Sequence, residues 1–188
     1  MSTFKRLAIL IFMFFALTAN SQALGQLFRM NHPMLGQTAP DFTLKTVQGN
    51  TVNMSTYRAG KPVIVFFWAT WCPHCRQQIS RLHKRIPELE RAGIRVIIID
   101  IQESAKKVQG YLERNRIKAD ICLDTQGTVS DQYGILGIPA YFLIDNQGTV
   151  RAVKNTFPSN YSGLLASVPD MQTIPFGQSA PEKAGINN

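Results

Sequence analysis

The sequence predicts an α/β three-layer sandwich with a mixed central sheet and an N-terminal hairpin. Two apolar runs, 62–68 and 94–101, have the length and the β-branched and aromatic content of buried strands. Each run is followed by a stretch of helical periodicity, and the late segments 141–144 and 149–153 flank a turn typical of a hairpin. Strands that alternate with helices and then close with a hairpin indicate a mixed sheet covered by helices.

The first 23 residues resemble an export signal. Lys5 and Arg6 precede the apolar stretch 7–17, and the small polar residues after it end in a candidate cleavage site, Ser-Gln-Ala, at 21–23. The apolar stretch is shorter than the roughly 20 residues of a membrane-spanning helix. We therefore expect a cleaved signal peptide over 1–23 and a periplasmic protein, with an uncleaved membrane anchor as the alternative.

The rest of the chain divides into a leader at 24–35, one domain at 36–168 and a disordered tail at 169–188, which is rich in Pro, Gly, Ser and Asn. The formal net charge is +8, but the sequence has no run of five or six like charges and no nucleic-acid motif. We expect no nucleic-acid partner.

Periodicity and turn residues predict the elements of the domain. Alternating apolar residues indicate a hairpin over 41–54, and a helix that begins near 73 carries Pro87 and ends at Gly93, a left-handed cap. The further expected elements are a helix over 104–115 capped by Ser104, a strand over 119–123, a helical turn over 127–133 and a last helix over 162–168.

The motif Trp-Cys-Pro-His-Cys at 71–75 lies where the strand 62–68 passes into the helix. Pro73 suits the first helical turn, where a missing N–H costs nothing. Cys72 is then expected at the exposed helix start, where unpaired N–H groups and the helix dipole favour a thiolate. Cys75 lies one turn on, close enough for a disulfide. This arrangement suits thiol–disulfide exchange, which needs no dissociable cofactor.

Other functions of the cysteine pair remain open alternatives. A zinc site needs a second pair of ligands, but the only other cysteine, Cys122, is alone and His83 is not placed as a partner. A structural disulfide usually closes a longer loop. A thiol peroxidase needs a Pro-x-x-x-Thr-x-x-Cys setting, which no cysteine here has.

A non-enzymatic alternative is a copper-binding chaperone that uses the cysteine pair with a histidine or methionine. Met30, His32 and Met34 lie close together in the leader, and thioether and imidazole ligands suit copper. A loose N-terminal segment explains the same three residues.

Several motifs in one order resemble the TlpA/ResA-like group of exported thioredoxin-fold thiol–disulfide oxidoreductases. The resemblance covers roughly 36–165. Its motifs are Ala-Pro-Asp-Phe at 39–42, the run from Val65 to Cys75, Tyr-Gly-Ile at 133–135, Gly-Ile-Pro at 137–139 and Phe-Leu-Ile-Asp at 142–145.

The resemblance implies a thioredoxin-like fold and a role for each site residue. Cys72 would be the attacking cysteine and Cys75 the resolving one, while Pro139 would be a cis proline facing the pair. The backbone of Ile138 would pair with an extended substrate segment. The expected partners are protein thiols or disulfides and a membrane redox partner that recycles the pair, and no metal is implied.

Two positions depart from related proteins. The group usually carries a glutamate where this chain has Gln78, and thioredoxin carries a buried aspartate where this chain has Phe66. The proton acceptor for Cys75 is therefore left open, with His74 or water as candidates. The Pro73-His74 dipeptide resembles DsbA-type oxidases, whereas the group suggests a reductase, so the direction of electron flow also remains open.

The residues around the pair are expected to modulate it or to pack. Pro73, His74 and Trp71 are candidate modulating residues, with Trp71 shielding the disulfide. Trp68 is expected in the core, and Cys122 is expected to be a buried, unreactive thiol. The helix that begins near residue 73 also carries basic residues, which could form a rim that attracts acidic partners or simply a solvated face. They are Arg76, Arg81, Lys84 and Arg85.

Overall fold

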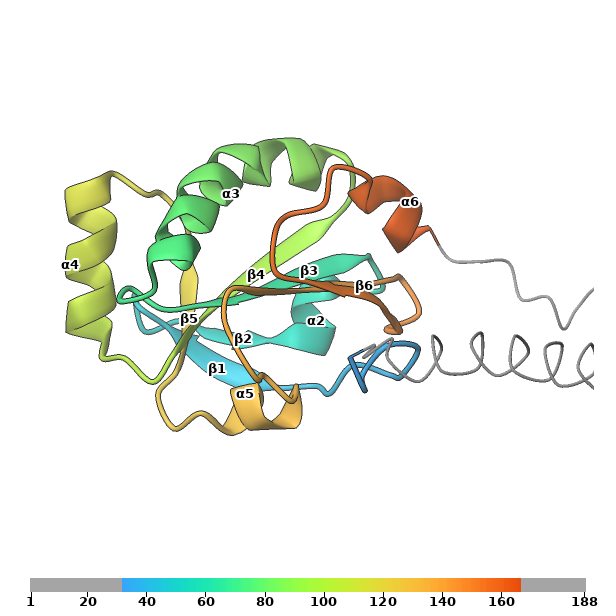
Figure 1. The fold of residues 1–188 in the computed structure, drawn as a ribbon, viewed down its shortest axis with the longest axis horizontal. Coiled ribbons are helices and arrows are strands. Elements are labelled where there is room, and N and C mark those ends of the chain that lie inside the picture. The colour runs from blue at the N-terminus through green and yellow to red at the C-terminus, as the bar shows by residue number, and fades with distance from the viewer. Residues whose placement is uncertain (1–31, 167–188) are drawn as a thin grey trace, which may run out of the picture.

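The computed structural model describes residues 32–166, so the expected signal peptide, most of the leader and the tail lie outside the described residues. One mixed sheet of seven strands has the order β2-β1-β5-β4-β3-β6-β7 (Figure 1). The strands are β1 (Thr43–Thr46), β2 (Thr51–Asn53), β3 (Val63–Trp68), β4 (Arg95–Ile101), β5 (Ile121–Asp124), β6 (Ala140–Ile144) and β7 (Val150–Lys154). The helices are α2 (Met54–Arg58), α3 (Pro73–Arg91), α4 (Ala105–Asn115), α5 (Thr128–Gln132) and α6 (Tyr161–Leu165).

Helices cover both faces of the sheet and make three layers. In Figure 1, α3, α4 and α6 lie on one face, and α2 and α5 lie on the other. Side chains alternate along each strand, so β3 sends Ile64, Phe66 and Trp68 to the α3 side and Val63, Val65 and Phe67 to the α5 side. The uninterrupted apolar sequence of β3 follows from burial on both faces.

The centre of the sheet is parallel. β3 pairs in parallel with β4, and β4 pairs in parallel with β5, while β6 runs antiparallel to β3. The carboxyl ends of β3 and β4 therefore meet at one edge, where Trp68 lies opposite Asp100. The loop that follows β3 leads directly into α3, so this edge presents the motif 71–75.

The predicted elements are present with small shifts at their ends. The N-terminal hairpin pairs Thr43 with Asn53, and the side-chain oxygen of Ser104 caps α4. Gly93 has a φ of +78°, as expected for a left-handed residue after a helix. The expected strand 119–123 becomes Ile121–Asp124, because its pairing with β4 begins only at Ile121.

None of the helices within 32–166 is long and apolar enough to cross a bilayer.

Candidate active site

The two motif cysteines lie at the first turn of α3 and form a disulfide with a Cα–Cα distance of 5.2 Å. Cys72 is the N-cap residue, and its sulfur accepts a hydrogen bond from the backbone N–H of Cys75 at 3.2 Å. Pro73 takes the first helical position, where its missing N–H leaves no bond unmade. The local sequence thus places the Cys72 sulfur among the free N–H groups of a 19-residue helix.

Cys72 is more buried than the sequence suggested. Its exposed fraction is 5%, against 0% for Cys75, so the expectation of an exposed helix start is wrong at this side chain. The reason is the loop before β6, which lies at the N-terminus of α3 and brings the carbonyl oxygen of Ile138 to 3.7 Å from Cys72 Sγ. Cys72 is still the more exposed of the two cysteines.

The loop before β6 carries the second half of the site. The peptide bond between Ile138 and Pro139 is cis, as the family resemblance implied. Pro139 also lines a shallow groove of about 300 Å³ together with His32, Leu136 and Gly137. The structure therefore brings Cys72, Ile138 and Pro139 to one place although 66 residues separate Cys72 from Ile138.

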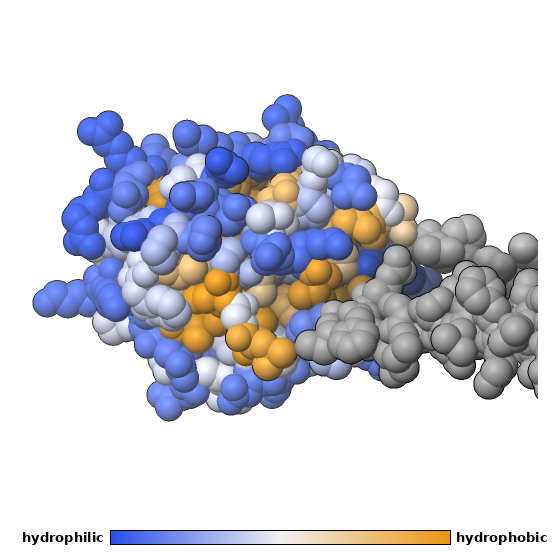
Figure 2. Space-filling view, viewed as in Figure 1, coloured by the Kyte–Doolittle hydropathy of each residue, from blue (hydrophilic) through white to orange (hydrophobic). Residues whose placement is uncertain are grey.

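The surface around the disulfide contains exposed apolar side chains. Trp71 directly precedes Cys72 in the chain and is 62% exposed. Leu136 lies two residues before Ile138, in the loop before β6, and is 96% exposed. Pro73 and His74 are exposed as well. Figure 2 shows that orange, hydrophobic residues gather over the loop between α5 and β6, whereas most of this face is hydrophilic. Trp71 therefore presents most of its side chain to solvent beside Cys72 in the chain.

Comparison with known proteins gives the family. The sequence profile of the AhpC/TSA family matches residues 35–153. The chain belongs to this family. The thiol-disulfide oxidoreductase ResA of Geobacillus thermodenitrificans is 32% identical over 119 residues, which are 63% of this chain and 68% of the relative. The thioredoxin-like protein YneN of Bacillus subtilis is 31% identical over 120 residues, 63% of this chain and 69% of the relative.

A solved structure agrees with the sequence relatives. The crystal structure of a thiol:disulfide interchange protein of the thioredoxin family from Chlorobium tepidum matches with a TM-score of 0.56 and 31% identity, covering 66% of this chain and 88% of the other. The predicted thioredoxin-like fold and the predicted resemblance to ResA-like proteins are confirmed. This AhpC/TSA family member is a thiol–disulfide oxidoreductase.

The two positions that depart from related proteins hold neutral side chains in this oxidoreductase. Phe66 is fully buried and stacks on Tyr141 with ring centroids 4.3 Å apart. The side-chain oxygen of Gln78 accepts hydrogen bonds from the hydroxyl of Tyr141 and the backbone N–H of Phe157, both at 3.3 Å. Gln78 thus joins α3 to β6 and to the segment before α6, and it brings no charge to the disulfide.

Sequence reasoning missed the acidic residues that lie beneath the reactive loop. Glu103 is buried and accepts two hydrogen bonds from Thr70, which lies two residues before Cys72. Asp100 is fully buried at the carboxyl end of β4. One sequence signal was available: Asp100 is the single acidic residue of the isoleucine-rich strand β4, at a position that faces the core.

Cys122 lies far from this chemistry. It is buried in the core on the α5 side of the sheet, opposite to the face that carries α3. Burial, with a smaller contribution from the charge of Asp120, raises the pKa of its thiol to about 12. The predicted buried thiol is confirmed, and its protonated state at neutral pH suppresses nucleophilic reactivity.

The candidate copper ligands can be placed only in part, because Met30 lies outside the described residues. His32 uses both ring nitrogens within the protein: Nε2 lies 3.2 Å from the carbonyl oxygen of Gly134, and Nδ1 lies 3.2 Å from the backbone N–H of Met34. Its ring also packs edge-on against Phe142. Within 32–166, no three His, Cys, Asp or Glu side chains cluster as a metal site would require.

The basic residues of α3 do not form one uniform rim. Arg76, Arg81 and Lys84 are exposed. Arg85 instead lies over the rings of Phe157 and Tyr161, with its guanidinium carbon 4.6 Å and 5.3 Å from the two centroids. Arg85 therefore helps hold the C-terminal segment on α3.

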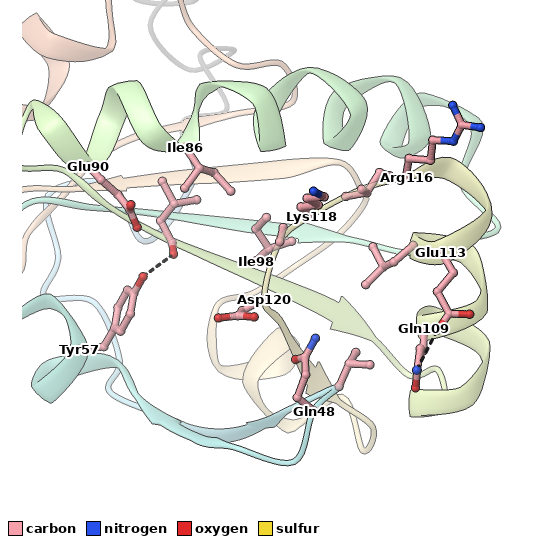
Figure 3. A pocket seen from close by; sticks show the side chains of 15 residues that line it. Gln48, Tyr57, Ile86, Glu90, Ile98, Gln109, Glu113, Arg116, Lys118 and Asp120 are labelled. Atoms are coloured by element: carbon pink, nitrogen blue, oxygen red, sulfur yellow. Dashed lines mark hydrogen bonds between the residues drawn. The ribbon is translucent and has the colours of Figure 1, made fainter.

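A pocket of the described residues lies away from the cysteines. It has a volume of about 780 Å³ and lies between the C-terminal halves of α3 and α4 and the starts of β4 and β5. Figure 3 shows Ile86 and Ile98 at its apolar wall, with Glu90, Asp120 and Lys118 around its edge. Because the disulfide lies at the opposite end of α3, this pocket is separate from the candidate active site.

Proposed function

We propose that this oxidoreductase exchanges disulfides with protein substrates through the pair Cys72 and Cys75. The observation that carries the proposal is the position of the Cys72 sulfur. It caps α3, it accepts the N–H of Cys75, and it lies 3.7 Å from the backbone of the cis-proline loop at Ile138. A sulfur in this setting is stabilised as a leaving or attacking thiolate and is next to a backbone edge that a polypeptide can use.

The exchange takes two steps. In the oxidising direction, a substrate thiolate attacks Cys72 Sγ, the Cys72–Cys75 bond breaks, and Cys75 leaves with the electron pair and takes a proton. A second substrate thiolate then attacks the substrate sulfur of the mixed disulfide, and Cys72 leaves as a thiolate. The substrate thus loses two electrons to the pair, and the reducing direction runs the same steps in reverse, with Cys75 as the resolving thiol.

The cis-proline loop is proposed to bind the substrate. An extended segment can use the carbonyl oxygen of Ile138, which lies 3.7 Å from Cys72 Sγ, as its acceptor, and Pro139 after it has no N–H to donate. The exposed side chains of Trp71 and Leu136 support the apolar residues of such a segment. Recognition through backbone atoms suits an enzyme that acts on several protein substrates.

The dipeptide Pro73-His74 and the neutral residues Phe66 and Gln78 support an oxidising pair. The helix N-terminus stabilises the Cys72 thiolate, and no carboxylate at positions 66 or 78 opposes it. Stabilising the thiolate stabilises only the reduced protein, since the disulfide carries no such charge. We propose a reduction potential above the value of about −270 mV typical of thioredoxin.

The export signal expected from the sequence of residues 1–23 supports a periplasmic location for this activity. The proposed arrangement is a signal peptide at 1–23, a leader at 24–35, the thioredoxin-like domain at 36–168 and a tail at 169–188. In an oxidising compartment the pair needs a partner that resets it after each turnover. We propose a membrane redox protein for that step.

Activity of cysteine variants tests the proposal. Wild-type protein is expected to reduce insulin or to oxidise a dithiol peptide, and Cys72→Ser and Cys75→Ser are each expected to lose this multiple-turnover activity. Cys122→Ala is the matched control and is expected to keep it. Full activity in Cys72→Ser would contradict the proposal.

A further inference from the structure

A buried carboxyl pair lies beneath the reactive loop, and the exchange steps above do not use it. Asp100 has no exposed surface, and neither of its carboxyl oxygens has a hydrogen-bond partner among the described residues. Glu103 is 6% exposed and lies just after the end of β4. A buried carboxyl group without partners is costly to maintain, which makes a positioning or electrostatic role worth testing.

Glu103 holds the loop that carries the reactive cysteine. One carboxylate oxygen accepts the backbone N–H of Thr70 at 2.5 Å, and the other accepts the hydroxyl of Thr70 at 2.8 Å. The same carboxylate forms an ion pair with Lys107 of α4 at 2.5 Å. Thr70 is itself buried, so these bonds fix the loop between β3 and α3.

The pair lies on the face of the sheet that carries the disulfide. Asp100 is paired in register with Trp68 on the neighbouring strand, and side chains paired in this way share a face. Trp68 belongs to the same core cluster as Cys72 and Cys75. The indole N–H of Trp68 is also buried without a partner among the described residues, as are the Asp100 oxygens.

We propose that Glu103 positions the reactive loop through Thr70 and that the net charge of Asp100, Glu103 and Lys107 sets the reduction potential of Cys72–Cys75. This inference rests on the proposed role of Cys72 as the thiolate of the reduced pair. Reduction adds two electrons and one proton: the S–S bond breaks, Cys75 takes the proton, and Cys72 keeps a negative charge. Only the reduced form therefore responds to charge near the loop.

The charges of the cluster balance at neutral pH. Burial, and after it the charge of Glu103, raises the pKa of Asp100 to about 9, so Asp100 is neutral. Burial opposes ionisation of Glu103 too, but the bonds from Lys107 and Thr70 outweigh it and lower the pKa of Glu103. Ionised Glu103 and Lys107 then cancel. Removing either one should shift the potential, and the two shifts should have opposite signs.

Two variants test this with glutathione equilibria at pH 7. Glu103→Gln leaves the Lys107 charge unbalanced and should favour the reduced protein by about tenfold, which is about 30 mV for a two-electron couple. Lys107→Met leaves the Glu103 charge unbalanced and should favour the disulfide, by about threefold because the lysine is half exposed and screened. Lys106→Met, an exposed lysine on the same helix, is the matched control and should not shift the equilibrium.

The opposite signs separate charge from mere loosening of the loop. Shifts of the same sign, or no shift in either variant, would overturn the inference. If Glu103→Gln does not fold, the surface variant Lys107→Met still tests the inference. Thiolate absorbance against pH is then the second readout, and the pKa of the Cys72 thiol should be higher in Lys107→Met than in the wild type. A wild-type pair that never equilibrates with glutathione would overturn the proposed function as well, whereas a normal wild type with unshifted variants would overturn this inference alone.

Discussion

Replacing Asp100 by Asn should change how the stability of the protein depends on pH. The carboxyl group is buried in the neutral form, with its pKa raised from 3.8 to about 9 by burial and by Glu103. A raised pKa in the folded state means that the folded protein holds a proton that the unfolded chain releases above about pH 4. Wild-type stability from this group is thus fully present below 3.8 and is lost as the pH rises toward 9.

The size of the effect follows from the pKa values. Between 3.8 and pH 7 lie about three units, and each unit corresponds to 1.36 kcal/mol, which gives a loss of as much as about 4 kcal/mol. Asparagine cannot ionise, so the variant should not suffer this loss. A buried amide with unmade hydrogen bonds costs about 1–3 kcal/mol at every pH. Asp100→Asn should therefore be at least as stable as the wild type at pH 7 and less stable than the wild type at pH 4.

The assay is urea unfolding of both oxidised proteins at pH 4 and pH 7. The informative quantity is the change with pH in the difference between their unfolding free energies, expected to be about 4 kcal/mol, because the fixed cost of the amide cancels from it. Glu103 titrates in both proteins, and its contribution largely cancels too. An equal difference at the two pH values would refute the assignment of a neutral, buried Asp100.

Three further predictions concern single side chains. Cys122→Ala should keep full exchange activity, and Cys122 in the folded, oxidised wild type should resist labelling by a thiol reagent, because its pKa is raised to about 12; rapid labelling of one thiol would contradict this. Gln78→Glu should lower the reduction potential, since a carboxylate one turn from Cys75 opposes the negative charge of the Cys72 thiolate. Either carboxylate oxygen can still accept the hydrogen bond from the Tyr141 hydroxyl. An unchanged or raised potential in glutathione titration would contradict this prediction. His74→Glu should lower the potential by no more than about 30 mV, one pKa unit of thiolate stabilisation, because this side chain is exposed; an unchanged or raised potential would contradict this prediction.

Local sequence signals were enough to predict the elements and the location of the cysteines. The apolar run of β3, the proline after Cys72 and the glycine after α3 each constrain a few neighbouring residues, and each prediction agrees with the structure. The burial of Cys72 was predicted incorrectly because it depends on Ile138, a residue 66 positions away whose loop lies across the helix start.

The buried carboxyl cluster could not be predicted from periodicity. The bonds between Glu103 and Thr70 join the ends of two adjacent parallel strands, and only the register of β3 with β4 brings the two residues together. The hydrogen-bond partners of Gln78 could not be predicted for the same reason, since Tyr141 lies in β6 and Phe157 lies in the segment before α6. Long-range pairing decided the surroundings of the site, whereas the local pattern decided its position.

The most direct test of the central claim is to identify which cysteine carries a trapped substrate. Cys75→Ser, incubated with a substrate protein or with oxidised glutathione, should accumulate a mixed disulfide that peptide mapping by mass spectrometry places on Cys72. Cys72→Ser should accumulate far less of any adduct, because Cys75 has no exposed surface. An adduct found mainly on Cys75 of Cys72→Ser, with none on Cys72 of Cys75→Ser, would contradict the account and reverse the roles of the two cysteines.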